Sequence, residues 1–569
     1  MTTEPRIAYF SMEIAIEPQI PTYSGGLGVL SGDTLRAAAD VGLPVVGVSL
    51  LHRQGFFRQR LGEDGTQSEV AASWQPERHL ELIRDVKVEV GIEGRRVCLQ
   101  PWLYKVRGAS GDTVAVYFLD ADLPDNAAED RALTGYLYGG DQRYRLCQEA
   151  LLGIGGTAML KALGYRQLET FHMNEGHSAL LTLSLLDEAC GSGGIESAGE
   201  AEYAIVRARS AFTTHTPVAA GHDRFGFDLV RHVLDARVFE AIERLPISHE
   251  GVLNMTDLGL FFSRYVNGVA RRHGEVASAM HPGFDVHSIT NGIHAATWTS
   301  PAHAALFDRE IPSWRKDNHY LRHANMLHLD HVMDAHRQAK QELLTEVEKR
   351  TGNRLDPSVL TIGFARRAAT YKRADLVFND LEKLRELSRE AGPVQFIFAG
   401  KAHPADEPGK ELIRRVFSAR DHLRSDVPVV WLEDYDMTLG RVLCAGVDLW
   451  LNNPVKPMEA SGTSGMKAAL NGVPSLSVLD GWWPEGWVEG VTGWSIGTSA
   501  DNDSDTENEV SSLYNKLRYV ILPLYYGSPS GYARVMRSTI AINGSYFTAQ
   551  RMVQQYALSA YQAGPDGSS

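Results

Sequence analysis

Cysteine is scarce in this 569-residue sequence: Cys98, Cys147, Cys190 and Cys444 are the only four, and they are scattered without metal-ligand spacing. This pattern argues against a disulfide framework or a cysteine-held metal, so we expect no metal site and a reduced, cytoplasmic protein. The sequence also lacks an apolar run of membrane-spanning length, and its first residues do not resemble a signal peptide. A membrane-embedded or disulfide-rich secreted protein is therefore not expected.

Positive charge is also in deficit, with 56 Lys and Arg against 70 Asp and Glu and a net charge of −14. This balance argues against nucleic acid or an anionic membrane as the main partner, although it leaves room for a local basic pocket. The remaining composition, 44% hydrophobic and 22% charged residues, is ordinary for a globular protein. Because 569 residues are too many for one ordinary core, the length predicts two large domains.

The stretch around Lys467 carries the most specific chemistry. Small residues at 461–465 open a short helix between two apolar runs, 447–452 and 474–479, which predict successive buried strands of a parallel sheet. Backbone N–H groups at such a helix start bind anions, and a buried Lys467 amine could form a Schiff base with a carbonyl compound. In isolation, a Gly/Ser-rich turn followed by a lysine is more often only a turn.

A glycine loop also lies near the start of the chain. Residues 23–28, Y-S-G-G-L-G, separate a strand at 7–10 from a helix at 30–41 and a second strand at 44–51. This is the phosphate-binding arrangement of α/β folds, which a nucleotide-sugar transferase would use equally well. Residues 52–125 alternate as strands and hairpins do, which predicts an antiparallel insertion.

Three polar side chains lie at breaks along the first half of the chain. His177 lies where a strand that begins at Thr170 gives way to a helix, and ligand-facing residues gather at such junctions in α/β folds. His215 lies within 211–217, a strand followed by a break, and Asn291 precedes Gly292 at the end of the first half. Each also has a purely structural explanation. A histidine can cap a helix, and Asn-Gly is a common turn.

Four cations gather at 366–373, after the buried strand predicted at 359–365. They are Arg366, Arg367, Lys372 and Arg373. Because they are bunched rather than spread around a helix, they suit a bound dianion better than a solvated helix face, although a surface run remains the alternative.

Several strings, in this order along the chain, resemble those of the α-glucan phosphorylases, the family of the glycogen, starch and maltodextrin enzymes, in a short form. The most specific is E-A-S-G-T-S-G-M-K at 459–467, which is similar to the family's pyridoxal-phosphate attachment sequence. The other similar strings are G-G-L-G at 25–28, T-T-H-T at 213–216, V-N-G-V-A-R-R-H-G-E at 266–275, T-N-G-I at 290–293, R-R-A-A-T-Y-K-R at 366–373 and G-K-A-H-P at 400–404. The string at 266–275 resembles a helix of the family.

The sequence departs from the family at a few positions. Arg366 replaces a lysine, which keeps the charge but changes the hydrogen-bonding geometry. Ser464-Gly465 stands where the family usually has Gly-Asn, and N-E-G-H-S at 174–178 stands for N-D-T-H-P.

The resemblance implies an α/β fold with two Rossmann-like domains facing a central cleft, the GT-B type of glycosyltransferase. We expect an N-terminal domain at 1–300 that contains the antiparallel insertion, and a C-terminal cofactor-binding domain at 301–535. Residues 536–569 are expected to form a helix that crosses back to the first domain and a short disordered tail. A second disordered segment is expected at 501–509, which is polar and acidic. Family members are usually dimers, so a homodimer is possible.

The resemblance also implies roles for single residues. Lys467 would carry pyridoxal 5′-phosphate, and the catalytic groups would hold the substrate phosphate or lie close to the sugar. The expected catalytic residues are Arg367, Lys372, His215 and Gly26. The expected cofactor-binding residues are Lys467, Thr463, Ser464, Gly465, Arg366 and Tyr435. The expected sugar-binding residues are Glu459, Ser461, Gly462, Asn291 and His177.

The implied reaction is the retaining phosphorolysis of an α-1,4-glucan, in which inorganic phosphate takes the non-reducing-end glucose as glucose 1-phosphate. A phosphate whose second pKa lies near 6 can exchange a proton at neutral pH, and the cations would offset the repulsion between two neighbouring dianions. The first alternative is a nucleotide-sugar-dependent, glycogen synthase-like transferase, which has no use for a lysine-linked cofactor. The second is a non-catalytic glucan-binding protein, against which the joint presence of Arg367, Lys372 and Lys467 argues.

Overall fold

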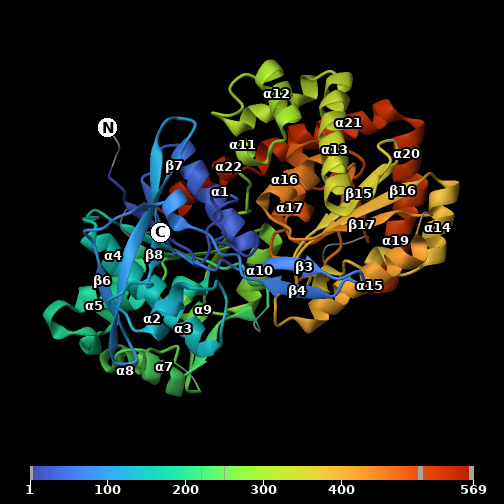
Figure 1. Ribbon diagram of the computed structural model, residues 1–569. Helices are drawn as coiled ribbons and strands as arrows, with labels where there is room; N and C mark the ends of the chain where they lie inside the picture. Colours follow the sequence, from blue (N-terminus) through green and yellow to red (C-terminus); the bar gives the residue numbers. More distant parts are fainter. Residues whose placement is uncertain (1–3, 219–220, 249, 425, 498–503, 563–569) are drawn as a thin grey trace.

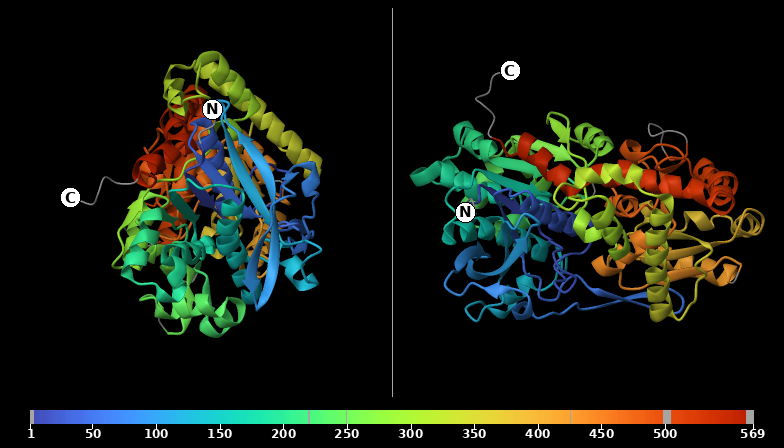
Figure 2. Two further views of the ribbon diagram at one scale, coloured as in Figure 1. Left: turned by 90° about the vertical axis from the view of Figure 1, so that its left-hand side faces the viewer. Right: turned by 90° about the horizontal axis from the view of Figure 1, so that it is seen from above.

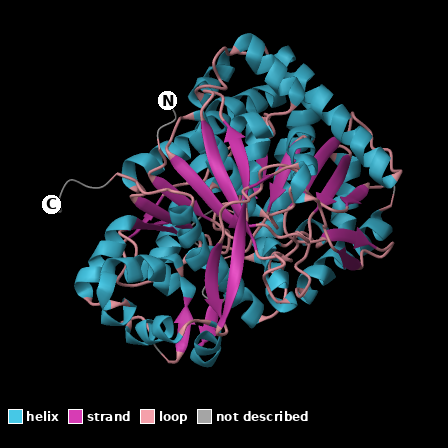
Figure 3. Ribbon diagram, turned by 60° about the vertical axis from the view of Figure 1, so that its left-hand side comes forward, coloured by secondary structure: helices cyan, strands magenta, loops and turns pink. Residues whose placement is uncertain are grey.

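The computed structural model describes residues 4–218, 221–248, 250–424, 426–497 and 504–562. The chain forms two lobes side by side, each built on a sheet with helices around it (Figures 1 and 3). Both sheets are largely parallel, which confirms the expected α/β class with two Rossmann-like units. The tail at 563–569, expected to be disordered, lies outside the described residues, and the exact domain boundaries stay predictions.

The first sheet has the strand order β14-β13-β10-β9-β1-β2-β8-β7-β5, with β6 beside β7. Neighbours from β14 to β8 pair in parallel, whereas β7 runs antiparallel to β8. The strands are β1 (Ile7–Phe10), β2 (Val45–Leu50), β5 (Glu81–Leu82), β6 (Val88–Ile92), β7 (Arg95–Arg107), β8 (Thr113–Asp120), β9 (Thr170–Asn174), β10 (Ser210–Thr213), β13 (Tyr265–Gly268) and β14 (Val286–Ser288).

Two expectations for this lobe need correction. The string at 266–275 was expected to be helical, but Tyr265–Gly268 is strand β13, and the helix α10 (Arg271–Met280) begins only after it. The buried pairing of Tyr265–Gly268 between β10 and β14 decides its conformation, because tertiary contacts override weak local preferences. In addition, β8, expected within the antiparallel insertion, joins the central sheet in parallel with β2.

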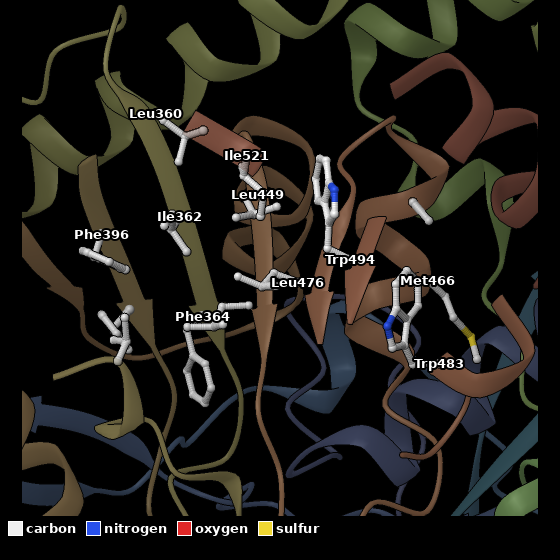
Figure 4. Packing of buried hydrophobic residues seen from close by; sticks show 14 of the residues in the cluster. Leu360, Ile362, Phe364, Phe396, Leu449, Met466, Leu476, Trp483, Trp494 and Ile521 are labelled. Carbon is white, nitrogen blue, oxygen red and sulfur yellow. The ribbon is translucent and has the colours of Figure 1, made fainter. Parts of the chain in front are cut away.

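The second sheet is parallel throughout, in the order β17-β16-β15-β18-β19-β20. Its strands are β15 (Leu360–Ala365), β16 (Val394–Ala399), β17 (Val429–Leu432), β18 (Leu449–Asn452), β19 (Ser475–Val478) and β20 (Gly493–Ile496). Every residue of β15, β16 and β18 is buried, as a parallel strand covered on both faces requires. Figure 4 shows the apolar layer on one face, in which Phe364, Leu449, Leu476 and Trp494 lie on the successive strands β15, β18, β19 and β20.

Helices cover both sheets. In the first lobe they are α1 (Gly26–Asp40), α2 (Ala128–Arg131), α3 (Gln142–Ala150), α4 (Gly156–Ala162), α5 (Leu181–Cys190), α6 (Glu200–Arg209), α7 (Phe227–Val233), α8 (Ala236–Arg244), α9 (Met255–Phe261), α10 and α11 (Ala295–Trp298). In the remainder they are α12 (Pro301–Glu310), α13 (Leu329–Thr351), α14 (Leu381–Glu390), α15 (Glu407–Leu423), α16 (Met437–Gly446), α17 (Thr463–Leu470), α18 (Trp483–Gly486), α19 (Thr506–Lys516), α20 (Leu522–Gly527), α21 (Pro529–Thr539) and α22 (Ala549–Ser559).

Two elements bridge the lobes. The last helix, α22, packs on α1, and the Tyr556 hydroxyl lies 3.2 Å from Thr213 Oγ1 at the end of β10. In the view from above in Figure 2, the red helices of the C-terminal segment run across both lobes. In the opposite direction, the hairpin of β3 (Arg58–Leu61) and β4 (Gln67–Val70) extends from the first lobe onto the second (Figure 1). A second small hairpin, β11 (Arg224–Gly226) with β12 (Val252–Asn254), stays within the first lobe.

Candidate functional site

The predicted site residues follow the carboxyl ends of strands at the two points where strand order reverses. From β1 the first sheet grows outward through β2, and β9 then returns on the other side of β1. From β15 the second sheet grows through β16 and β17, and β18 returns beside β15. Ligands of open α/β sheets bind outside such switch points. The glycine loop follows β1, His177 follows β9, the cation string 366–373 follows β15 and Glu459 follows β18.

Lys467 lies inside α17 and is buried. Its Nζ lies 3.6 Å from the ring centroid of Trp298, and within the described ranges the amine makes no hydrogen bond or ion pair. Burial lowers the pKa of the Lys467 amine, and the nearby Asp33 carboxylate partly offsets that effect. A buried amine with a depressed pKa is more readily neutral, and therefore nucleophilic, than a solvated lysine.

Two of the predicted phosphate-binding cations converge on Glu459. Arg366 Nη1 and Lys372 Nζ each lie 2.5 Å from Glu459 Oε2, and all three side chains are buried. Burial alone would raise the pKa of the Glu459 carboxyl, but the two cations outweigh it and hold this pKa at about 2. Arg366 also donates to the Asn452 side chain at the end of β18. The structure therefore places cofactor-, phosphate- and sugar-binding candidates in one cluster.

The other two cations of the string behave differently from each other. Arg367 is exposed and has no carboxylate partner among the described side chains, which leaves its charge available to an anion. Arg373 is buried and its Nη1 lies 2.6 Å from Glu509 Oε2, so this charge is already used inside the second lobe. Glu509 belongs to α19, which begins at Thr506, so the expected disorder at 501–509 is wrong for Thr506–Glu509. Residues 501–503 lie outside the described chain.

The glycine loop presents an open backbone at the start of α1. A Cβ at Gly26 would meet nothing within 4 Å, and Gly26 is exposed in the first turn of this 15-residue helix. The preceding N–H groups are occupied, because Ser24 N and Gly25 N donate to Glu13 Oε2 at 2.5 and 3.2 Å. Glu13 therefore holds the loop in shape, whereas Gly26 remains free to receive an anion.

The loop before α17 contains the predicted sugar-binding atoms. Ser461 Oγ and Asn291 Oδ1 are both buried without a hydrogen-bond partner in the described chain. Such orphaned atoms are uncommon in proteins and point to a missing polar partner. Gly462 adopts a left-handed φ of 90°, which favours glycine, and a Cβ at Gly465 would approach the Trp482 ring to 3.0 Å. Thr463 and Ser464 fill the first turn of α17 between these two glycines.

The two predicted histidines are tied to neighbours in the first lobe. His215 Nε2 lies 2.7 Å from Asn174 Oδ1, and burial lowers the pKa of its imidazole to about 3, so the ring is neutral. His177 Nε2 lies 3.3 Å from Asp223 Oδ2, which also binds Arg145 at 2.6 Å. Neither imidazole contacts Glu459 or Lys467. The structure therefore ties both histidines to the first lobe and does not bring them into contact with the cluster.

Tyr435 follows β17 and lies beside the helix α16. Burial, followed by the neighbouring Cys444 and Tyr23, raises the pKa of its hydroxyl well above the usual value, so the phenol stays protonated. A Cβ at Gly440 would approach the Tyr435 hydroxyl to 2.8 Å, which explains the glycine there.

Sequence reasoning missed four residues at the site: Glu13, Asp33, Trp298 and Asp480. Asp480 accepts the backbone N–H of Glu459 at 2.9 Å and that of Gly481 at 2.9 Å. Its position after β19 and that of Glu13 after β1 are the sequence signals that could have found them. Asp33 and Trp298 lie within helices and carry no such signal.

Across the described ranges, no group of three or more His, Cys, Asp or Glu side chains is arranged to hold a metal ion. None of the helices in the described chain combines the length and apolar character that crossing a bilayer requires.

Comparison with known proteins agrees with the geometry. The carbohydrate phosphorylase family model matches residues 236–483. The chain is 37% identical to the maltodextrin phosphorylase of Thermococcus litoralis and to the glycogen phosphorylase of Mycobacterium tuberculosis, over 98% of its own length and 70% of theirs. It is 29% identical to an uncharacterised protein of Methanocaldococcus jannaschii over 98% of its own length and 99% of that protein. The chain therefore belongs to the carbohydrate phosphorylase family of glycosyltransferases.

Proposed function

We propose that this enzyme is an α-1,4-glucan phosphorylase. It transfers the non-reducing-end glucose of glycogen or a maltodextrin to inorganic phosphate, with retention of configuration, and releases glucose 1-phosphate. The observation that carries the proposal is the cation cluster after β15, where Arg366 and Lys372 flank Glu459 and the neighbouring Arg367 has no carboxylate partner in the described chain. The names of two relatives, a maltodextrin phosphorylase and a glycogen phosphorylase, support the choice of glucan. Family membership favours this reading over a nucleotide-sugar transferase.

The proposed cofactor is pyridoxal 5′-phosphate, and the residues present fit it. Lys467 would carry it, because the amine is buried and makes no hydrogen bond in the described chain. The N–H groups of Thr463 and Ser464 at the start of α17 would bind its phosphate, with Arg366 balancing the charge and Tyr435 near the ring. Gly465 would close this turn, because its N–H donates to Gly462 O at 3.3 Å. When bound, the cofactor supplies a phosphate group that can exchange a proton near neutral pH.

The remaining residues would bind the two substrates. Arg367, Lys372 and the Gly26 N–H would hold inorganic phosphate. The hydroxyls of the terminal glucose would be bound by Glu459, Ser461, Gly462 and Asn291, with the backbone of His215 and the side chain of His177 on the side of the first lobe. The unpaired Asn291 Oδ1 and Ser461 Oγ support this assignment, because a sugar hydroxyl would give each a partner.

Lys372 would change partners on binding. Its ammonium pairs with Glu459 in this structure, and an incoming phosphate would compete with that carboxylate for it. Glu459 would then be free to accept hydrogen bonds from the sugar. The cation that holds phosphate and the carboxylate that binds glucose would thus be released together.

The test combines an assay with chemical mapping. Full-length enzyme is given inorganic phosphate with glycogen, short maltodextrins or other α-linked glucosides, and glucose 1-phosphate is measured. Borohydride reduction followed by peptide mapping locates any pyridoxyl group. Phosphate-dependent product together with an adduct on Lys467 is expected. Absence of the adduct would remove the cofactor assignment, whereas an adduct without product would favour a glucan-binding protein. A cytoplasmic location and a homodimer remain part of this proposal.

A further inference from the structure

The β3–β4 hairpin of the first lobe ends in contacts with the second lobe, and its two buried glutamines make the central ones. Gln59 Nε2 donates to Gly400 O at 2.9 Å, and Gln59 Oε1 accepts the Asp434 N–H at 3.0 Å. Gln67 Nε2 donates to Ala402 O and its Oε1 accepts the Ala402 N–H, both at 3.0 Å. The two amides are also joined by a 2.8 Å hydrogen bond. Each glutamine side chain therefore donates to a backbone carbonyl of the second lobe and accepts a backbone N–H from it.

The surrounding contacts fix the hairpin firmly. Lys401 Nζ donates to Phe57 O at 2.9 Å and lies 2.6 Å from Asp434 Oδ1. At the tip, Arg420 donates to Glu63 O at 2.8 Å. Gln59 has no exposed surface and Gln67 is 6% exposed, so water does not compete for their amides. Figure 1 shows β3 and β4 extending from the first lobe toward α15 of the second.

The segments that the hairpin holds support the cation cluster directly. Ala368 N donates to Lys401 O at 2.9 Å, and Arg366 N donates to Ala399 O at 3.1 Å. The fit is tight, because a Cβ at Gly400 would lie 1.8 Å from Arg366 O. Arg366 and Arg367 therefore stand on a backbone whose position depends on Gly400 and Lys401. Asp434, the third point of contact, immediately precedes Tyr435.

We infer that Gln59 and Gln67 are positioning residues for the anion site, so that a hairpin from the first lobe sets the geometry of the phosphate-binding cations in the second. The inference rests on the proposed phosphate chemistry of that site. Neither glutamine touches the reacting groups. They act through Gly400–Ala402 and Asp434, because displacement of an oriented group by a fraction of an ångström is enough to weaken its contact with a bound anion.

The test uses full-length enzyme carrying Gln59→Leu or Gln67→Leu, with Arg60→Gln as the matched control. Arg60 lies on the same strand, but its contact is an exposed ion pair with Glu433 at 2.8 Å. Backbone amide exchange reports the contacts themselves. We expect faster exchange at Asp434 in Gln59→Leu and at Ala402 in Gln67→Leu, with no change in Arg60→Gln. If a leucine variant does not fold, Gln67→Glu replaces it, because glutamate keeps the acceptor for the Ala402 N–H and loses the donor.

The decisive readout is the Kd of inorganic phosphate, measured by titration calorimetry without turnover. We expect a roughly tenfold weaker Kd in the glutamine variants and an unchanged KM for glucan. Faster exchange with an unchanged Kd would mean that the hairpin holds the two lobes together without positioning the anion site, and it would overturn the inference. So would a wild-type enzyme that binds no phosphate. A wild-type enzyme that binds phosphate but releases no glucose 1-phosphate would overturn the proposed function alone.

Discussion

The indole N–H of Trp298 donates to both carboxylate oxygens of Asp33, at 3.0 and 2.8 Å, while the face of the same indole lies 3.6 Å from the Lys467 amine. Asp33 belongs to α1, the helix that follows the glycine loop, and Lys467 belongs to α17. The backbone of Trp298 is fixed as well, because Asn471 Nδ2 donates to both Trp298 O and Lys467 O. The predicted cofactor lysine is thus connected to the predicted phosphate loop through one tryptophan.

Substitution of Trp298 by Phe tests that connection. The variant keeps most of the aromatic surface but leaves the Asp33 carboxylate buried, with Arg36 at 3.8 Å as its remaining partner. Because an unsatisfied buried acceptor is costly, the free energy of unfolding should fall by about 1–3 kcal/mol, as measured by denaturant titration. The matched control is Trp487→Phe, since Trp487 donates to Glu489 at 2.8 Å in an exposed position. An equal loss in both variants would mean that the buried Trp298–Asp33 hydrogen bonds contribute no more to the free energy of unfolding than the exposed one.

Removal of the Glu459 charge should make stability depend on phosphate. In Glu459→Gln, Arg366 and Lys372 stay buried without their common counter-ion, which should cost about 3–5 kcal/mol of unfolding free energy. Inorganic phosphate should restore part of this loss, and it should raise the unfolding midpoint of the variant more than that of wild type. Equal shifts in the two proteins would argue against phosphate binding at these cations. Glu188→Gln, which removes an exposed partner of Lys161, serves as the control.

Asp480 should give stability a defined pH dependence. Burial raises the pKa of its carboxyl from 3.8 to about 7, and the Glu459 charge adds to that effect. Between these two values the folded chain holds a proton that the unfolded chain has released, so the contribution of Asp480 to stability falls as pH rises, by up to about 1.4 kcal/mol per pH unit. Asp480→Asn cannot ionise. Its stability relative to wild type should therefore increase from pH 5 to pH 8 in denaturant titrations, and a constant difference would contradict the raised pKa.

Local sequence patterns were enough to place several strands of the second sheet, although β20 was not predicted. The runs at 359–365 and 474–479 were predicted to within one residue at each end, because a parallel strand buried on both faces must be continuously apolar. The same logic located the loops that carry Arg366 and Glu459, since ligands gather at the carboxyl ends of such strands. It failed at Tyr265–Gly268, where a short buried strand has too few residues to show a period.

Contacts between the lobes could not be predicted in this way. Gln59 contacts Gly400 across 341 residues, and one glutamine in an alternating strand carries no sign of its partner. The bunching of cations at 366–373 could be recognised in the sequence, but the ion pair between Arg373 and Glu509 could not. That glutamate lies in a stretch whose polarity is typical of disorder. The sequence therefore indicates which groups lie at a strand end, whereas tertiary packing decides which of them remain free for a ligand.

A buried ion pair far from the site offers a test that separates stability from binding. Lys340 Nζ of α13 lies 2.6 Å from Asp448 Oδ2, and His336 Nε2 lies 2.9 Å from Asp448 Oδ1. Asp448 immediately precedes β18, at the amino end of the strand, whereas Glu459 follows its carboxyl end. Asp448→Asn leaves the Lys340 ammonium buried without its counter-charge, so the free energy of unfolding should fall by about 3–5 kcal/mol.

The double variant Lys340→Met with Asp448→Asn should recover part of that loss, because no unpaired charge is then buried. The Kd of inorganic phosphate should remain unchanged in the single and the double variant, since the pair lies at the end of the sheet opposite the cation cluster. Denaturant titration and calorimetry measure the two quantities separately. A weaker phosphate Kd in Asp448→Asn would show that this pair also sets the position of β18. A double variant no more stable than the single one would mean that the loss comes from hydrogen bonds to Asp448 rather than from the buried charge. One such hydrogen bond is donated by Thr361 N at 2.7 Å.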